Sequence, residues 1–236
     1  MTSYVLRNER CPECAKHGND RSGDNLAVYS DGHTYCFRCG FGSRRTRIAE
    51  RVERCEETVV LPADVDTELP YEARKWLEQY NLSRLDLIKH HVMWSPSLQR
   101  IIFPYFDQTG LLAWQGRYVG EEKKAKWFSQ GKIHEIIHPI NVNKREAVLV
   151  EDIISAIKVS KVKGAIPLFG SSISGKHFLR LKKVVDRVWV WLDPDMRSKS
   201  LKMASLGKLL DMDTHVIFSD KDPKEEDDET IRSKLT

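Results

Sequence analysis

Val188-Trp-Val-Trp-Leu-Asp-Pro-Asp195 is the stretch that decides the fold of this chain. Five apolar residues in a row are typical of a buried strand, and two aspartates follow them directly. Similar apolar runs precede Glu151 and the pair Asp220 and Asp222. Carboxylates that meet at one sheet edge repel each other unless a cation lies between them, and Mg²⁺ or Mn²⁺ suits oxygen ligands. The pattern predicts a metal-dependent phosphoryl-transfer site.

The second half of the chain alternates between strand and helix patterns. Strands are expected at residues 147–150, 165–169, 188–192 and 215–218, and helices at residues 153–163, 177–185 and 200–210. This alternation predicts a mostly parallel sheet with helices on its faces. Such sheets place their sites at the carboxyl ends of the strands, and Glu151, Asp193 and Asp220 all occupy predicted strand ends.

Four of the five cysteines form two closely spaced pairs. Cys11 and Cys14 are separated by two residues, and so are Cys36 and Cys39. This spacing is typical of a tetrahedral zinc site with four thiolate ligands, and such a closed site is structural. Two strands alternate around a Ser-Asp-Gly turn between the pairs, which indicates a zinc ribbon. On its sheet, His33 and Arg38 are candidates for contact with nucleic acid.

Composition and charge narrow the class of protein. The chain has 236 residues, 41% of them hydrophobic, and a formal net charge of +4. No apolar run approaches the roughly 20 residues that cross a bilayer, and the N-terminus lacks a signal-peptide pattern, so we expect a cytoplasmic protein. Basic stretches at residues 43–54, 116–132 and 176–187 alongside acidic clusters suit a protein that holds nucleic acid near metal ions.

The remaining patterns give the organisation of the chain. Helical spacing begins after Pro70, Ser83 is a plausible N-cap of a second helix, and strands are expected at residues 100–106 and 111–118. We therefore predict a mixed α+β (α/β) chain with four parts. These are a zinc ribbon (1–42), a helix and linker (43–68), a first half of the core (69–145) and a parallel-sheet half (146–236).

In this order the motifs resemble those of DNA primases of the bacterial and phage type, over nearly the whole chain. Cys-Pro-Glu-Cys at 11–14 and Cys-Phe-Arg-Cys at 36–39 resemble the zinc-binding domain of phage primases. Ile-Ile-Phe-Pro at 101–104, Gly116-Arg117 and Lys126-Trp-Phe-Ser resemble the first half of the RNA polymerase domain. Residues from Glu151 onward resemble a Toprim fold, with an Asp-x-Asp motif at Asp193 and Asp195 and a late Lys-Asp-Pro-Lys-Glu at 221–225.

The resemblance implies synthesis of short RNA primers on single-stranded DNA from ribonucleoside triphosphates. Glu151, Asp193, Asp195 and Asp222 would be catalytic and would hold Mg²⁺ or Mn²⁺, with Asp220 as a further ligand. Arg117 and Lys126 would bind the triphosphate or the template, and His33 and Arg38 would contact the template. The resemblance also implies a stand-alone enzyme that acts with a separate replicative helicase. The compact chain and the style of its ribbon favour a phage origin over a mobile element, and hence the cytoplasm of an infected host.

The first acidic motif departs from the family pattern Glu-Gly-x-x-Asp. Asp152 stands at the glycine position and Ser155 at the position of the second acidic residue, which leaves the ligand set open. Two other functions therefore stay open. One is a metal-dependent nuclease of the same fold, and the other is a non-catalytic zinc-ribbon adaptor that binds single strands and recruits a helicase.

Overall fold

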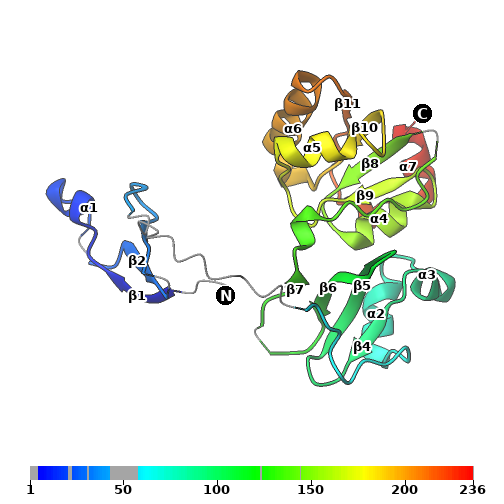
Figure 1. Ribbon diagram of the computed structural model, residues 1–236, viewed down its shortest axis with the longest axis horizontal. Coiled ribbons are helices and arrows are strands. Elements are labelled where there is room, and N and C mark those ends of the chain that lie inside the picture. The colour runs from blue at the N-terminus through cyan, green and yellow to red at the C-terminus, as the bar shows by residue number, and fades with distance from the viewer. Residues whose placement is uncertain are drawn as a thin grey trace. The chain divides into compact units, whose positions relative to one another are not determined.

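The computed structural model describes residues 5–20, 23–30, 32–42, 58–122, 124–143 and 145–235. The chain divides into two compact units, residues 1–56 and 57–236 (Figure 1). The four-part division predicted from the sequence stays a prediction, and most of its linker, residues 43–57, lies outside the described residues. No helix in the described part of the chain is long and apolar enough to cross a membrane.

The N-terminal unit is a small antiparallel sheet with a short helix. Its elements are β1 (Val5–Glu9), α1 (Pro12–Lys16), β2 (Leu26–Tyr29) and β3 (Thr34–Cys36), in the sheet order β1-β2-β3. Strand β1 was not expected, because all five of its side chains are exposed and give no alternating pattern. The core cluster consists of Leu26 and three of the cysteines. So small a core needs a metal to hold the unit together.

The C-terminal unit contains the predicted parallel sheet. Strands β8 (Glu146–Val150), β9 (Ala165–Pro167), β10 (Arg187–Val190) and β11 (Asp213–Val216) are ordered β11-β10-β8-β9, and every pair is parallel. Helices α4 (Ile153–Ser160), α5 (Gly175–Leu181), α6 (Arg197–Leu209) and α7 (Asp228–Leu235) flank it. The chain runs from β8 to β9 on one side and then crosses to β10 on the other, so the strand order reverses at β8.

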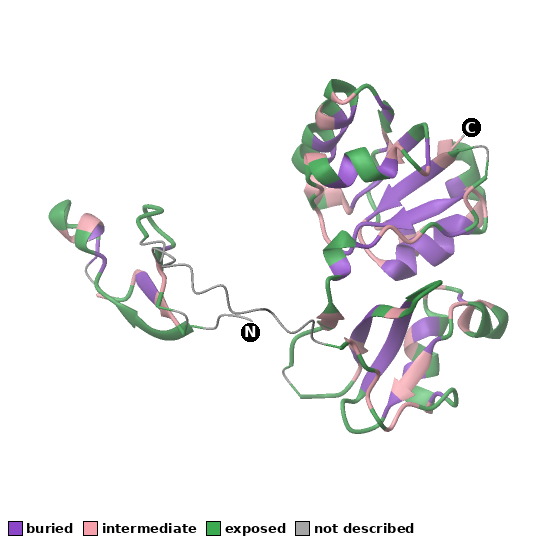
Figure 2. Ribbon diagram, viewed as in Figure 1, coloured by how far each residue is buried: buried purple, intermediate pink, exposed green. Residues whose placement is uncertain are grey.

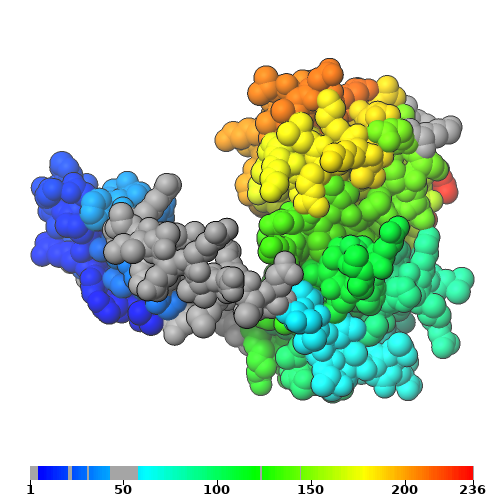
Figure 3. All heavy atoms as spheres, in the orientation of Figure 1, coloured from blue at the N-terminus to red at the C-terminus, as the bar shows by residue number. Residues whose placement is uncertain are grey.

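The sheet is covered on both faces, as its apolar strands require. Ala147 and Leu149 belong to one core cluster with Phe178 of α5, whereas Val148 and Val150 pack in another cluster with α4. Helices α5 and α6 therefore lie on one face and α4 and α7 on the other (Figure 1). In the space-filling view, α5 (yellow) and α6 (orange) form one continuous surface (Figure 3). A Cβ at Gly207 of α6 would lie 2.4 Å from Thr214 Oγ1, so glycine permits this close packing.

An antiparallel half precedes the parallel sheet. It consists of α2 (Tyr71–Glu78), α3 (Arg84–Lys89) and the strands β4 (Met93–Ser95), β5 (Arg100–Asp107), β6 (Gly110–Tyr118) and β7 (Trp127–Gly131), in the sheet order β4-β5-β6-β7. Ser83 caps α3 as predicted, and Asp86 completes a capping box. The short edge strands β4 and β7 were not expected. Strand β7 is half-buried and too short to show a clear period.

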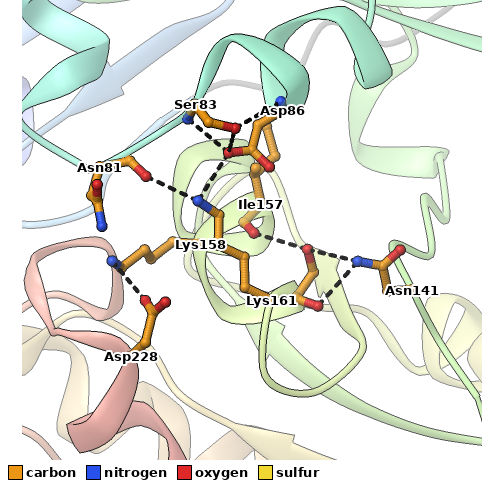
Figure 4. Close-up of polar contacts among 9 residues, drawn as sticks. Asn81, Ser83, Asp86, Asn141, Ile157, Lys158, Lys161 and Asp228 are labelled. Carbon is orange, nitrogen blue, oxygen red and sulfur yellow. Dashed lines mark hydrogen bonds and ion pairs between the residues drawn. The ribbon is translucent and has the colours of Figure 1, made fainter.

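Helix α4 joins the two halves of this unit. All eight of its residues are buried (Figure 2). Polar contacts fix its C-terminal end (Figure 4). The Nζ of Lys158 lies 2.9 Å from Asp228 Oδ1 of α7, and the Nζ of Lys161 lies 2.9 Å from Asp86 Oδ2 of α3. Asn141 donates to the backbone oxygen of Ser160 at 3.0 Å. These contacts hold helix α4 against both halves of the C-terminal unit.

Three short 3-10 turns complete the unit: η1 (Ile133–Glu135), η2 (Pro194–Met196) and η3 (Pro223–Glu225). Turn η2 directly precedes α6, so this helix begins at Arg197, three residues earlier than the apolar pattern indicated. Helix α5 begins at Gly175 because Ser174 caps it, and it ends at Leu181, four residues before the predicted end. Turns η2 and η3 follow Asp193 and Asp222 directly, so both aspartates are placed where the backbone changes direction.

Candidate functional site

Glu151 and Asp193 lie at the carboxyl ends of adjacent strands. Glu151 directly follows β8, Asp193 follows β10 after Trp191 and Leu192, and β8 pairs with β10. Each residue has a buried carboxylate oxygen, Glu151 Oε2 and Asp193 Oδ1, that forms no hydrogen bond with any described residue. A buried carboxylate oxygen without a partner is costly unless a cation binds it. The two residues are therefore the candidates for holding a divalent cation, at the point where the strand order reverses.

Asp152 and Lys224 occupy the same edge of the sheet. Asp152 caps α4 by accepting from the Ser155 backbone N–H at 2.8 Å. The Nζ of Lys224 donates to Asp222 Oδ2 at 2.7 Å and to Asp152 Oδ2 at 3.1 Å, and it lies 3.9 Å from Asp193 Oδ2. The lysine side chain is only 14% exposed. We call Glu151, Asp152, Asp193, Asp222 and Lys224 the acidic edge.

Burial and nearby charges shift the pKa values of three groups of the acidic edge, Asp193, Glu151 and Lys224. Burial raises the pKa of Asp193, and the neighbouring carboxylates of Asp222 and Glu151 raise it further, to about 7 despite the nearby lysine. Burial and the charge of Asp152 also raise the pKa of Glu151. Burial alone would lower the pKa of Lys224, but the surrounding carboxylates raise it well above its usual value. Shifts of this kind are typical of functional sites.

The other two predicted carboxylates are less enclosed. Asp195 is exposed, and its charge contributes to the raised pKa of Glu151, so it lies near the acidic edge. The side chain of Asp220 is 98% exposed, and its Oδ1 lies 3.2 Å from Arg197 Nη2. The roles of Asp220 and Asp222 as metal ligands stay predictions. The structure pairs the first with an arginine and the second with Lys224.

Arg117 of β6 faces the acidic edge from the antiparallel half. Its guanidinium lies 4.8 Å from the ring of Trp76 in α2 and 5.7 Å from the ring of Trp127 in β7. Burial lowers its pKa, while Tyr80 and Asp152 act in the opposite sense, so the arginine lies within electrostatic reach of Asp152. Among the described residues, none forms a hydrogen bond with the buried Nε. The two rings contact the planar group and restrict its orientation, and a guanidinium held in this way suits an anion.

Lys126 directly precedes β7 and has an exposed side chain and an anchored backbone. Its carbonyl accepts from the Tyr118 backbone N–H at 2.9 Å and from Arg100 Nη1 at 3.3 Å. Arg100 is itself buried, donating also to the backbone oxygens of Gly116 and Ala125. The segment is therefore held rigidly, and the Lys126 side chain extends into solvent.

The four cysteines of the N-terminal unit form a tetrahedral group. The Sγ atoms of Cys11 and Cys39 lie 3.7 Å apart and those of Cys14 and Cys36 3.6 Å apart, and all four lie within 4.8 Å of one another. Four sulfurs about 2.3 Å from one zinc ion are about 3.8 Å apart in a tetrahedron. The group therefore fits one structural zinc. Of the described residues, these four are the one set of three or more metal-ligating side chains this closely grouped.

The surroundings of Cys36 favour its thiolate form. Burial raises the pKa of the Cys11 and Cys14 thiols. Burial acts in the same sense on Cys36, but backbone N–H groups of Cys39 and Arg38 donate to its sulfur and outweigh it, so its pKa falls to about 7. N–H donors of this kind stabilise the deprotonated sulfur that a zinc ion requires.

The surface of the N-terminal unit carries exposed aromatic rings. Tyr35 and Phe37 are 44% and 70% exposed, and their rings meet edge to face at 5.3 Å. His33 stacks on Tyr29 with the ring centres 4.0 Å apart. Arg38 is exposed and lines a shallow hollow beside Cys14 and Cys39. Exposed rings with a nearby cation are features of single-strand binding surfaces.

Comparison with solved structures gives the fold a precedent. The zinc-binding and RNA polymerase domains of the Aquifex aeolicus primase match 99% of this chain and 77% of their own, with a TM-score of 0.62 and 14% identity. The DnaG primase catalytic domain bound to ssDNA matches 71% of this chain and 72% of its own, with a TM-score of 0.55 and 16% identity. The chain has the fold of DnaG-type primases.

The primase fold extends through both units. The primase fragment of the bacteriophage T7 primase-helicase protein matches 94% of this chain and 94% of its own, with a TM-score of 0.50 and 18% identity. No protein-family model and no curated protein sequence matches the chain. Identities this low show the fold alone, so the activity has to be argued from the residues.

Sequence reasoning missed three residues of this site. Trp76 stands in the helical pattern after Pro70 and Trp127 in the Lys126-Trp-Phe-Ser motif, and neither pattern indicates that the two rings contact Arg117. Lys224 is one residue of the late motif at 221–225, and the motif does not indicate that this lysine contacts the carboxylates of the acidic edge. The closest partner of Lys224 is Asp222, two residues away, but its second partner Asp152 lies 72 residues away, so no local pattern indicates that the lysine joins the two carboxylates.

Proposed function

We propose that this chain is a primase that synthesises short RNA on a single-stranded DNA template. The observation that carries the proposal is the pair of buried oxygens without partners on Glu151 and Asp193, at the carboxyl ends of adjacent strands in a primase fold. The solved DnaG-type domain bound to ssDNA supports the choice of template. The separate helicase, the phage origin and the cytoplasmic location stay predictions.

In the proposed reaction, the 3′-hydroxyl oxygen of one ribonucleotide bonds to the α-phosphorus of a nucleoside triphosphate. The bond from this phosphorus to the pyrophosphate oxygen breaks, and the hydroxyl proton passes to solvent. Glu151 and Asp193, with Asp195 beside them, would hold a divalent cation, which when bound polarises the attacked phosphate. Arg117 would bind the triphosphate through a guanidinium already fixed between two rings, which lowers the entropic cost of binding.

Lys126 and the N-terminal unit would contact the nucleic acid. The exposed Lys126 side chain suits a phosphate contact that positions the template. Tyr35 and Phe37 would stack on bases, with His33 and Arg38 beside them. The zinc, held by the four cysteines, would keep this surface folded and take no part in the chemistry.

The test is ribonucleotide incorporation on mixed-sequence single-stranded DNA with Mg²⁺ or Mn²⁺. Asp193→Asn and Asp195→Asn should each lower incorporation at least about 100-fold, because each removes a charge that the cation needs. Asp211→Asn is the matched control, since that aspartate is fully exposed in the turn after α6, and it should leave incorporation unchanged.

Two results would count against a primase. Degradation of the DNA with metal but without nucleotides would favour the nuclease. Binding of single strands without incorporation, even with Mn²⁺, would favour the adaptor.

A further inference from the structure

Lys224 occupies the middle of the acidic edge. Its ammonium group contacts Asp222 and Asp152 within hydrogen-bond distance and lies 3.9 Å from Asp193 Oδ2. We propose that Lys224 takes the place of a second divalent cation, so that the edge binds one such ion on the side of Glu151 and Asp193. The inference rests on the proposed function only in assuming that a divalent ion binds to this edge.

The carboxylate oxygens divide into two groups around the lysine. Asp152 uses both of its oxygens, Oδ1 for the Ser155 N–H and Oδ2 for Lys224. Asp222 also directs Oδ2 at the lysine. In contrast, Asp193 Oδ1 and Glu151 Oε2 are buried and have no hydrogen-bond partner in the part of the chain that the structure describes. The oxygens that still need a cation therefore lie with Glu151 and Asp193, and those that already have one lie with Asp152 and Asp222.

The sequence departures at this edge fit the same division. Asp152 stands where the resembling family has glycine, and its carboxylate is matched by the Lys224 ammonium, so the pair adds no net charge. Pro223 directly precedes the lysine and is buried in η3, which restricts the backbone that presents the side chain. A divalent ion placed between Asp193 and Asp222 would lie against this ammonium and be repelled. Lys224 is thus a positioning residue, and its ammonium group lies 3.9 Å from the second carboxylate oxygen of Asp193, Oδ2.

The experiment counts bound metal without nucleotide or DNA. Mn²⁺ is titrated into the zinc-loaded full chain, and the free ion is followed by electron paramagnetic resonance. Wild type should bind one Mn²⁺ that Asp193→Asn abolishes. Lys224→Met should bind a second Mn²⁺ or bind the first at least tenfold more tightly, since the competing cation is gone. Lys221→Met is the matched control: it removes the same charge from an exposed side chain nearby and should titrate as wild type does.

A variant that keeps Lys224 but changes one of its carboxylate partners tests the same division of the oxygens. Asp222→Asn should keep the wild-type Mn²⁺ count, because Asp222 serves the lysine and not the ion. This arm also decides the matter if Lys224→Met does not fold, which circular dichroism would show. The proposal is overturned by two Mn²⁺ or none in wild type, by equal effects of Lys224→Met and Lys221→Met, or by loss of Mn²⁺ in Asp222→Asn.

The number of bound Mn²⁺ ions and primer synthesis by wild type test the role of Lys224 and the primase function separately. A second Mn²⁺ in Lys224→Met, together with no primer synthesis by wild type, would contradict the primase function and sustain the role of the lysine. Primer synthesis by wild type, with unchanged metal binding in Lys224→Met, would support the primase function and contradict the role of the lysine.

Discussion

At the scale of single residues, the site depends on charged groups held in unusual surroundings. Arg117 is the clearest case, since two tryptophan rings flank its guanidinium and its buried Nε has no partner. Lysine keeps the charge but has no plane to stack, so the exchange is not conservative at such a position. We expect the arginine to be needed for its shape as well as its charge.

Arg117→Lys should weaken nucleoside triphosphate binding about tenfold, which corresponds to about 1.4 kcal/mol. Binding is measured by anisotropy of a fluorescent ribonucleotide in the presence of metal. Arg74→Lys makes the same change on an exposed position of α2 and should bind as wild type does. Equal affinity in all three proteins would contradict a nucleotide-binding role for Arg117.

His90, which caps the C-terminal end of α3, gives a pH dependence. Burial lowers its pKa to about 4, and the positive charges of His138 and Lys89 act in the same sense. The unfolded chain binds the proton with a pKa of about 6.5. Because the unfolded state takes up the proton first, this residue stabilises the fold fully above about pH 6.5, and that stability is lost as the pH falls towards 4.

His90→Gln should therefore reduce the loss of stability between pH 7.5 and pH 5.0. The measurement is the urea midpoint at both pH values, followed by tryptophan fluorescence. His91→Asn is the control, because His91 is exposed at φ 51°, a conformation that asparagine tolerates. If His90→Gln loses as much stability as wild type, the neutral, half-buried His90 is not a source of the pH dependence.

At the scale of elements, α4 is the helix that joins the two halves of the C-terminal unit. All eight of its residues are buried, including Lys158, whose side chain is 4% exposed and whose partner Asp228 lies on α7. Removing the partner of a buried charge lowers the free energy of unfolding far more than replacing both charged groups with apolar ones does. The ion pair therefore fixes the contact between the two helices and contributes little net stability.

Asp228→Asn should destabilise the unit by about 1–3 kcal/mol, less than for a fully buried pair because the aspartate side chain is 39% exposed. Lys158→Met should cost under about 1 kcal/mol, since it leaves no uncompensated charge. Urea unfolding of both variants gives the two values. A larger loss for Lys158→Met than for Asp228→Asn would show that the ion pair itself stabilises the contact.

At the scale of the whole molecule, the chain consists of two units with different sources of stability. The N-terminal unit has a core of one leucine and three cysteines, whereas the C-terminal unit has large apolar clusters on both faces of its sheet. The six tryptophans all lie between residues 76 and 191, so their fluorescence reports on the C-terminal unit alone. The two units should therefore respond separately to loss of metal.

Removal of zinc should unfold the N-terminal unit and leave the other folded, because the zinc replaces a core that this unit lacks. One zinc per chain should be released by a mercurial reagent and measured with a colorimetric dye. Hydrogen exchange should then rise over residues 5–42 and stay unchanged over residues 58–235, with constant tryptophan fluorescence. Unchanged exchange over residues 5–42 would show that the metal is not what holds this unit together.

Local sequence patterns predicted the four cysteines as a zinc site, the alternation of strands and helices, and the mixed α/β fold. Two cysteines separated by two residues meet one ion whatever surrounds them, and apolar periodicity reflects burial within a single element. The positions of Glu151 and Asp193 at strand ends followed in the same way, because a carboxylate after an apolar run needs no partner from elsewhere to be placed there.

Only the tertiary structure decided which charged groups meet. The order β11-β10-β8-β9 makes β8 and β10 neighbours, and this brings Glu151 to Asp193. The same packing brings Lys224 to Asp152 across 72 residues and places Arg117 between Trp76 and Trp127. Strand order and the docking of the two halves are set by the shape of the shared core. No local pattern records that shape, and the sequence by itself therefore left the ligand set open.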